Sequence, residues 1–361
     1  MQLQNVIETI ENCRFCLMCR HVAPVGHVTA QEALTPHGVA LLASSQRRGL
    51  IEWTAETVGV IYSEVDGGNS RVHCVNSLPF EESIAAVRAE LVEQGLAPTA
   101  VINIQQKLTK WQTPYAEQSP QPVTGTGDVA LFVGDEAAYL RETTLPAVLQ
   151  LLSATGVKPV LVGNGRNNGL LAQTLGFPEL AQTLIQSTLD EIASSGAKTL
   201  LVLSAGDTFV FNQMMTERLG LKRPSDLQIV EVTHYLAESD ITFIQIEDDV
   251  PTAYVDPTHA VRVANRHDGV RGLVTAVYAQ PLRELFWRRE RAHPVGSTHL
   301  QFSNPALAEQ LTRARLQDAQ NMGVKRVVCE DVGTLWQIGR FADEYGLQIQ
   351  GLYELLAAQL N

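Results

Sequence analysis

The chain has 361 residues, of which 45% are hydrophobic and 18% are charged, and its formal net charge is −12. This length predicts two or three domains, and the apolar content is sufficient for a sizeable core. The acidic balance argues against a nucleic-acid-binding protein, because binding to phosphate backbones requires basic patches.

Cysteine usage and hydropathy indicate a cytoplasmic protein. Three of the five cysteines fall in one short motif, which predicts a reducing compartment and no disulfide framework. The first eight residues contain neither a basic nor an apolar segment, so we expect no signal peptide. Since no apolar run is long enough to cross a bilayer, we expect membrane contact only through a partner.

The first motif along the chain is a run of three cysteines, Cys13, Cys16 and Cys19, followed by Ala23 and Pro24. This is the bacterial ferredoxin pattern C-x2-C-x2-C-x3-C-P with alanine at the fourth cysteine. A tight loop with this spacing points three thiolates into one pocket, as a cubane iron–sulfur cluster requires. In two-cluster ferredoxins the fourth cysteine binds the other cluster, so its loss predicts that a second cluster is absent.

The second half of such a motif is reduced to one residue, Cys74. Counting back from it at ferredoxin spacing gives Ser70, Gly67 and Glu64 in place of cysteines. The thiols that remain form one complete ligand set: Cys13, Cys16, Cys19 and Cys74. We therefore expect one [4Fe–4S] cluster, whose iron these four cysteines bind, with Cys74 as the distant fourth ligand.

Two other readings of the cysteines remain open. Four thiolates also satisfy tetrahedral zinc, although structural zinc sites usually pair two C-x2-C knuckles. Alternatively the cysteines are incidental, since free cysteine packs as a small hydrophobe.

The rest of the chain predicts an α/β fold. Residues 1–112 read as a helical ferredoxin-like [4Fe–4S] module, with a clear amphipathic helix from Phe80 that stops at Gly95. Residues 113–128 are rich in Pro, Gly, Ser and Thr and read as a linker. Short β-branched runs then alternate with amphipathic helices, which implies parallel sheets covered by helices. The predicted strands are 129–133, 159–162, 199–203, 227–232 and 327–329.

The two-thirds of the chain after the linker contains an internal repeat. With an offset of 127 residues, Pro178 and Leu184 match Pro305 and Leu311, and the segment at Gly196 matches that at Gly323. We therefore expect two similar α/β domains, 129–238 and 239–361, packed as a pseudo-twofold pair.

A ferredoxin-like module followed by two such repeats resembles the iron–sulfur subunits of glycolate oxidase and heterodisulfide reductase, with their cysteine-rich CCG domains. The resemblance covers essentially the whole chain, and it implies that each repeat would supply further ligand cysteines. Here those positions hold other residues, so the repeats are degenerate CCG-type domains that cannot ligate iron–sulfur. Cys329 lies two residues before its expected position and reads as a buried strand cysteine.

Two roles are open for the degenerate repeats. They can serve as a docking scaffold. Alternatively, the polar residues at the former cysteine positions line a small-molecule pocket between the domains. These residues are Asp135, Asn167, Asn168, Asp207, Asp256 and His259.

The expected function follows from the cluster. A cubane with four thiolates has no open iron and suits single-electron transfer, and the chain has no flavin or nicotinamide motif of its own. We therefore expect a non-catalytic electron-transfer subunit of a multi-component oxidoreductase, in a hetero-oligomer with a flavin-containing dehydrogenase or an electron-transfer flavoprotein. Arg14 and Arg20 flank the cysteines and would steer an acidic partner. The alternatives are a non-redox enzyme with an open iron as Lewis acid, and an interaction scaffold with a structural cluster.

Overall fold

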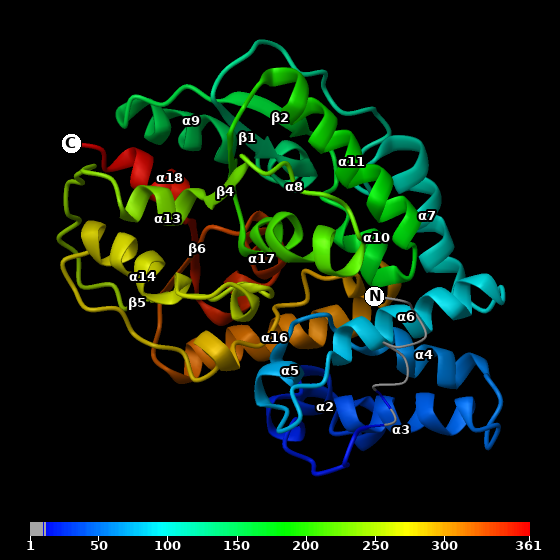
Figure 1. Ribbon diagram of the computed structural model, residues 1–361. Coiled ribbons are helices and arrows are strands. Elements are labelled where there is room, and N and C mark those ends of the chain that lie inside the picture. The colour runs from blue at the N-terminus through cyan, green and yellow to red at the C-terminus, as the bar shows by residue number, and fades with distance from the viewer. Residues whose placement is uncertain (1–9, 11) are drawn as a thin grey trace.

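The computed structural model describes residues 10 and 12–361 (Figure 1). Residues 1–9 and 11 lie outside the described part, and with them the segment in which we expect no signal peptide. The predicted α/β class is confirmed, since helices cover two parallel sheets. None of the helices in the described part is both long enough and apolar enough to span a membrane.

The segment before the first sheet is helical throughout its described part. Its elements are η1 (Arg20–Val22), α2 (Pro24–Thr29), η2 (Glu32–Leu34), α3 (Pro36–Arg47), α4 (Ala55–Ser63), α5 (Asn69–His73), α6 (Phe80–Glu93) and α7 (Thr99–Trp111). The helix predicted from Phe80 is confirmed as α6, and it buries Ile84, Val87 and Leu91 at helical spacing.

The first sheet has four parallel strands in the order β2-β1-β3-β4. They are β1 (Val129–Val133), β2 (Val160–Asn164), β3 (Thr199–Val202) and β4 (Gln228–Glu231), all within two residues of the predicted bounds. Its central strands are buried on both faces, as expected for a parallel sheet between helices. We call residues 129–238 and 239–361 the two halves. The helices of the first half are α8 (Gly134–Tyr139), α9 (Thr144–Ala154), α10 (Leu170–Leu175), α11 (Pro178–Ser195), α12 (Ala205–Phe209), the π-helix η3 (Val210–Arg218) and α13 (Val232–Ala237).

The second sheet has three parallel strands in the order β5-β6-β7. They are β5 (Thr252–Tyr254), β6 (Arg326–Cys329) and β7 (Gln348–Gly351), and neither β5 nor β7 has a predicted counterpart. A single parallel bridge between Ala253 and Arg283 stands where β2 stands in the first sheet. The helices here are η4 (Ala260–Arg262), α14 (Arg266–Val277), η5 (Arg289–Arg291), α15 (Leu300–Ser303), α16 (Pro305–Asn321), α17 (Val332–Gly339), η6 (Ala342–Tyr345) and α18 (Leu352–Ala358).

The repeat in the sequence corresponds to repeated elements. The strands β3 and β6 start 127 residues apart, and so do the helices α11 and α16. The last helix of each half packs on the other half: α13 lies against α14, and α18 lies against α9. Arg141 beside α9 binds Glu354 of α18 at 2.6 Å. The two halves are therefore interlocked by their final helices.

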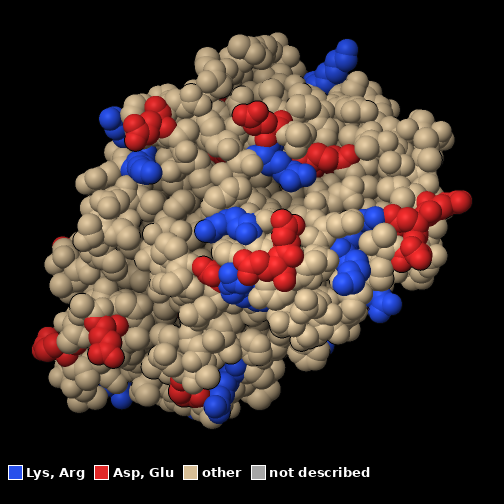
Figure 2. Space-filling view, turned by 180° about the vertical axis from the view of Figure 1, so that it is seen from behind, with Lys and Arg blue, Asp and Glu red and all other residues tan. Residues whose placement is uncertain are grey.

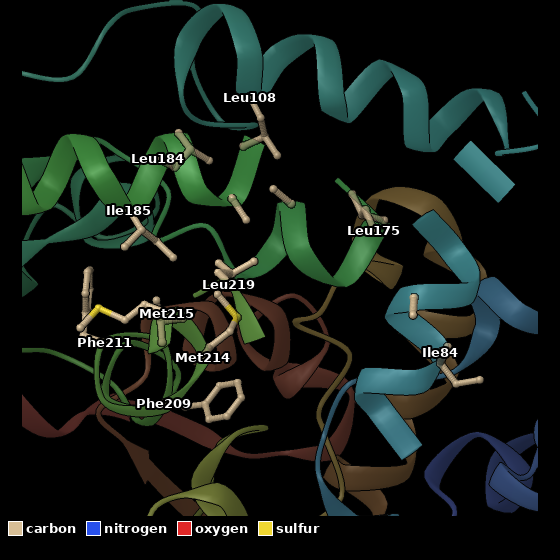
Figure 3. Packing of buried hydrophobic residues seen from close by; sticks show 14 of the residues in the cluster. Ile84, Leu108, Leu175, Leu184, Ile185, Phe209, Phe211, Met214, Met215 and Leu219 are labelled. Carbon is tan, nitrogen blue, oxygen red and sulfur yellow. The ribbon is translucent and has the colours of Figure 1, made fainter. Parts of the chain in front are cut away.

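The helical N-terminal segment shares a hydrophobic core with the first sheet. Leu108 of α7 and Ile84 of α6 belong to one buried cluster with residues of α10, α11 and η3, several of which Figure 3 labels. A second core fills the opposite face of this sheet and continues into α14 and α18. Apolar burial therefore joins all three segments of the chain.

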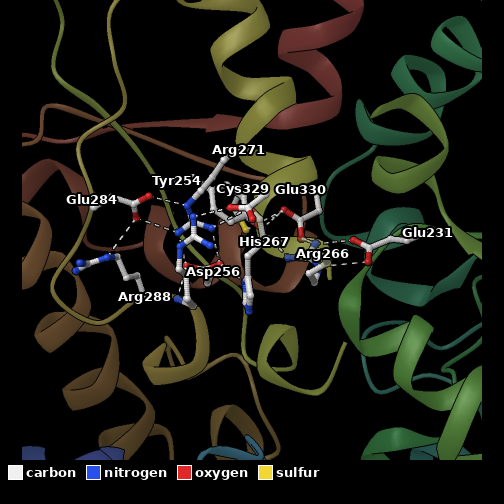
Figure 4. A network of polar contacts seen from close by, with 12 residues as sticks. Glu231, Tyr254, Asp256, Arg266, His267, Arg271, Glu284, Arg288, Cys329 and Glu330 are labelled. Atoms are coloured by element: carbon white, nitrogen blue, oxygen red, sulfur yellow. Dashed lines mark hydrogen bonds and ion pairs between the residues drawn. The ribbon is translucent and has the colours of Figure 1, made fainter. Parts of the chain in front are cut away.

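A buried ionic network also joins the two halves (Figure 4). Arg266 of α14 binds Glu231 at the end of β4 and Glu330 just after β6. Tyr254 completes it by donating its hydroxyl to Glu330 at 2.8 Å. All four side chains are buried, so each charge depends on the others for compensation.

Candidate functional site

The predicted cluster ligands lie together at the N-terminal end of the helical segment. Cys13, Cys19 and Cys74 line one pocket, although Cys74 is more than fifty residues away in sequence. The other lining residues are mainly apolar: Ile10, Pro36, Ala40, Leu78 and Phe80, with His37, Ser70 and Ser83. Cys16 is exposed and does not line this pocket, but its charge lies close enough to contribute to raising the pKa of Cys13.

Burial is the main influence on these thiols. It raises the pKa of Cys13, and the neighbouring Cys74 and Cys16 raise it further. Burial also raises the pKa of Cys19 to about 11, against a hydrogen bond from the backbone of His37. Thiols in this state keep their protons until a metal displaces them, so loading of the site would release protons.

The spacing of the cysteine side chains bears on the choice between a cluster and a single ion. Four thiolates around one zinc stand about 3.8 Å apart, since each Zn–S bond is about 2.3 Å. In the described part of the chain, no three Cys, His, Asp or Glu side chains are close enough to hold one metal ion. A cubane binds each thiolate through a different iron and accepts wider spacing, which agrees with three thiols spread around an apolar pocket.

The cysteine loop is held in an unfavourable backbone conformation. Phe15 and Leu17, on either side of Cys16, have φ of 48° and 64°, and Ser77 after Cys74 has φ of 48°. A non-glycine residue in this region costs about 1–2 kcal/mol. Strain of this kind is typical of loops whose side chains must face a ligand.

Exposed apolar side chains surround the exposed Cys16. Phe15, Leu17 and Met18 of the loop are each more than 40% exposed, as are Val72 and Val75 beside Cys74. We call these five residues the cysteine-loop patch. Large exposed apolar groups gathered in one region are typical of an interaction surface.

Of the two arginines expected to steer a partner, Arg20 pairs with Glu32 at 3.0 Å. Arg14 forms no ion pair among the described residues and is exposed. Arg14 is therefore the stronger candidate for a steering charge.

The positions of the lost second ligand set are filled by protein. Ala23 is buried, and Ser70 donates a hydrogen bond to Glu81 at 2.7 Å. The backbone carbonyl of Glu64 accepts a hydrogen bond from Arg88, which is wholly buried and also binds the carbonyls of Ile61 and Thr174. The guanidinium joins α4 to α10 there.

Cys329 lies apart from the other cysteines, in β6. It is fully buried next to Glu330, within the network of Figure 4. Burial raises the pKa of its thiol well above the usual value, with Glu330 and Asp331 adding to the shift. This environment agrees with a strand cysteine rather than a ligand.

A second candidate site is a cavity of about 120 Å³ at the carboxyl ends of the strands, between the two halves. Five of the six polar residues predicted at former cysteine positions line it: Asp135, Asn167, Asn168, Asp207 and His259. The sixth, Asp256, binds Arg271 and His267 instead and does not line the cavity. We call this space the inter-repeat cavity.

Sequence reasoning missed several residues of this cavity. Glu136 follows Asp135 and accepts a hydrogen bond from Tyr115, which comes from the segment read as a linker. Thr113 of the same segment is buried and donates to Asp135. His299, at the N-cap of α15, and Gln301, within α15, also line the cavity. The one available signal was that Glu136 stands directly after Asp135, a position already singled out.

Comparisons with known proteins support the fold alone. No family model matches the sequence, and no curated protein matches it. A similar solved structure is described as "Crystal structure of a hypothetical protein from Helicobacter pylori". It is 10% identical, with a TM-score of 0.59, over 99% of this chain and 76% of that one. The chain thus shares its α/β architecture with that bacterial protein.

Proposed function

We propose that this chain is an electron-transfer iron–sulfur subunit of a multi-component oxidoreductase. The observation that carries the proposal is the common pocket of Cys13, Cys19 and Cys74, with Cys16 beside it. When bound, a [4Fe–4S] cluster supplies a one-electron couple. The resemblance to the glycolate oxidase and heterodisulfide reductase iron–sulfur subunits supports the same assignment, and half-buried thiols suit the reducing cytoplasm.

The residues around the pocket have separable tasks in this proposal. The four cysteines would hold the cluster, and the apolar wall would exclude water from it. Both ring nitrogens of His37 are engaged, Nδ1 with the hydroxyl of Thr35 at 3.0 Å and Nε2 with Glu32 at 2.7 Å. His37 would therefore form part of the pocket wall rather than bind iron. Exposed Cys16 would place one ligand at the surface, where electrons enter or leave.

The cysteine-loop patch is the proposed contact for a flavin-containing dehydrogenase or an electron-transfer flavoprotein. Its apolar residues would pack against the partner, and Arg14 would attract acidic groups during approach. On the face shown in Figure 2, acidic and basic side chains alternate in small groups and form no broad field of one sign. On that face no broad charge field would steer a partner, so the proposed steering rests on Arg14 beside the loop.

Iron analysis of anaerobically purified or reconstituted full-length chain tests the proposal. We expect about four irons and four sulfides per chain, and one reducible cluster by EPR. A matched sample of the Cys13→Ser/Cys19→Ser variant serves as the control and should lose the signal. Stoichiometric zinc, about eight irons, or an EPR signal that shifts on adding small thiols or anions would contradict it.

A further inference from the structure

The inter-repeat cavity contains four carboxylates that have no cationic partner. Asp135, Glu136, Asp207 and Asp331 all line it. In the described part of the chain none of them pairs with Lys, Arg or His, whereas the nearby Asp66 and Glu330 pair with arginines. Asp135 and Asp207 are buried, and Glu136 and Asp331 are half-buried. Carboxylates removed from water without a counter-charge are costly, so four around one space require an explanation.

The partners that these carboxylates do have are neutral donors. Asn167 and Thr113 donate to Asp135, at 3.1 and 3.2 Å. Asn168 and Ser204 donate to Asp207, at 2.7 and 2.8 Å.

Glu136 and Asp331 have neutral donors as well. Glu136 accepts from Tyr115 at 3.3 Å and from the backbone N–H of Gly333 at 3.1 Å. Asp331 accepts from the backbone N–H of Thr334 at 2.7 Å. The carboxylates are thus fixed in position, but their charge is left uncompensated.

The pKa values of these carboxyl groups are raised because their charge is uncompensated. Burial, with Asp331 and Asp135 adding, raises the pKa of Asp207 to about 7. Burial raises the pKa of Asp135 to about 6. The pKa of Glu136 is raised well above its usual value by burial and by Asp331 and Asp135. A bound positive charge would relieve all of these shifts together.

Unpartnered hydrogen-bond acceptors line the same cavity. The Nε2 atom of His299 lies 3.0 Å from the carbonyl of Tyr62 and must donate to it, so Nδ1 carries a free lone pair. This Nδ1 has no partner although His299 is only 2% exposed. The Oε1 of Gln301 is also unpartnered, since its Nε2 donates to Tyr115. Thr258, 5% exposed, has an unpartnered hydroxyl.

The charge of the cavity and its unpartnered acceptors therefore indicate the same kind of ligand. The cavity presents negative charge and free acceptors, so its occupant must supply positive charge and N–H donors. Its walls also include the rings of Tyr115, Phe132 and Phe302. Aromatic faces attract organic cations, and this lining favours them over a hydrated metal ion.

We propose that the inter-repeat cavity binds a small organic cation, an amine or guanidinium compound. Its cationic nitrogens would lie among Asp135, Glu136, Asp207 and Asp331, and its remaining N–H groups would donate to His299 and Gln301. The proposal does not depend on the iron–sulfur assignment, because no cysteine lines this cavity.

The test is binding of defined probes to the full chain by calorimetry and thermal unfolding. The cationic probes are putrescine and agmatine; butyrate, butanol and magnesium chloride at matched ionic strength are the comparisons. We expect a cationic probe to raise the melting temperature and to bind at least about tenfold more tightly at about pH 8 than at about pH 5, where the carboxylates are protonated.

Two single variants locate the site. Asp207→Asn and Glu136→Gln should each weaken binding of the cationic probe at least about fivefold while leaving the far-ultraviolet circular dichroism unchanged. Asp268→Asn is the matched control, since Asp268 is exposed and pairs with Arg289 outside the cavity, and it should bind as the wild type does. The proposal would be overturned if no cationic probe bound, or if both variants bound the probe as tightly as the wild type does. Preference for butyrate or magnesium over the cationic probes would also overturn it.

Discussion

The cysteine pocket and the inter-repeat cavity handle charge in opposite ways. In the cysteine pocket, burial raises the pKa of Cys13 and Cys19, so these thiols keep their protons until they bind metal, and they flank a strained stretch that exposes Cys16. In the inter-repeat cavity, carboxylates are held inside the molecule by neutral donors, between elements far apart in sequence. The first site therefore lies within the N-terminal helical segment, whereas the second is part of how the two halves meet.

Loss of a cluster ligand should give the largest contrast. Cys74→Ser should abolish the intact [4Fe–4S] signal or convert it to a three-iron form, because the fourth iron loses its thiolate. Cys329→Ser should leave the spectrum unchanged, since Cys329 is buried in β6 away from the pocket. EPR and iron content report both. Equal loss of iron from the two variants would mean that the fourth ligand is misassigned.

Removal of the cation from the buried ionic network between the halves should lower the stability of the fold instead. Arg266→Met leaves Glu231 and Glu330 buried without their shared cation, which should lower the free energy of unfolding by about 3–5 kcal/mol. Arg313→Met is the control, because Arg313 pairs with Glu309 and Glu344 at the surface, and its loss should change the free energy of unfolding far less. Urea denaturation measures both. Similar losses in the two variants would show that the buried network contributes little.

The cavity carboxylates should also give stability a definite pH dependence. The pKa of Asp207 is about 7 in the folded chain and about 4 when unfolded. The folded state therefore holds the extra proton, and its advantage is present below about pH 4 and lost as the pH rises to about 7. Asp207→Asn should remove this loss and raise the free energy of unfolding by roughly 1–3 kcal/mol at about pH 8, with little change at about pH 4.

Denaturation series at several pH values measure this effect. The carboxylates with arginine partners provide the internal contrast, since Arg262 and Arg218 lower the pKa of Asp66 to about 2 against the effect of burial. Asp66→Asn should therefore destabilise the chain at neutral pH. A variant at Asp207 that is destabilised at about pH 8 would contradict the idea of uncompensated charge.

Reversal of a surface charge beside the cysteines should have the smallest effect. Arg14→Glu should slow reduction by an acidic flavoprotein about two- to threefold and weaken the salt dependence of the rate, with iron content unchanged. Arg20→Glu should do less, because Arg20 is already paired with Glu32. Stopped-flow reduction at several salt concentrations measures this, with Arg48→Glu at the far end of α3 as the control. Unchanged rates in Arg14→Glu would remove the steering role.

The two sites also differ in how much the sequence could predict. The positions of five strands and the repeat could be predicted, because β-branched runs and a constant offset are visible in the sequence alone. The cysteine motif placed Cys13 and Cys19 in one pocket, as its short spacing predicts, but its middle cysteine, Cys16, lies exposed outside that pocket. The inter-repeat cavity was only partly predictable: Asp135 and Asp207 stood at recognisable positions, but Asp256 had nearby partners in Arg271 and His267 that no spacing revealed.

Residues brought in by distant segments could not be found from pattern at all. Tyr115 lies in a stretch whose composition reads as a linker, yet it forms part of the cavity wall. His299 owes its free lone pair to a contact with Tyr62, more than two hundred residues earlier in the chain. Likewise β5 has only three residues, too few to show an alternating pattern.

The exchange of final helices between the halves, α13 against α14 and α18 against α9, limits how the protein can move. A hinge motion that separated the halves would strip apolar faces from both at once. A small molecule would therefore enter the cavity without separation of the halves, past single segments such as the one that carries Thr113 and Tyr115. Exchange with solvent would then be governed by a local loop opening on the microsecond to millisecond scale rather than by domain separation. Hydrogen exchange at the backbone amide of Tyr115, which bonds its neighbour Thr113, would report that opening directly.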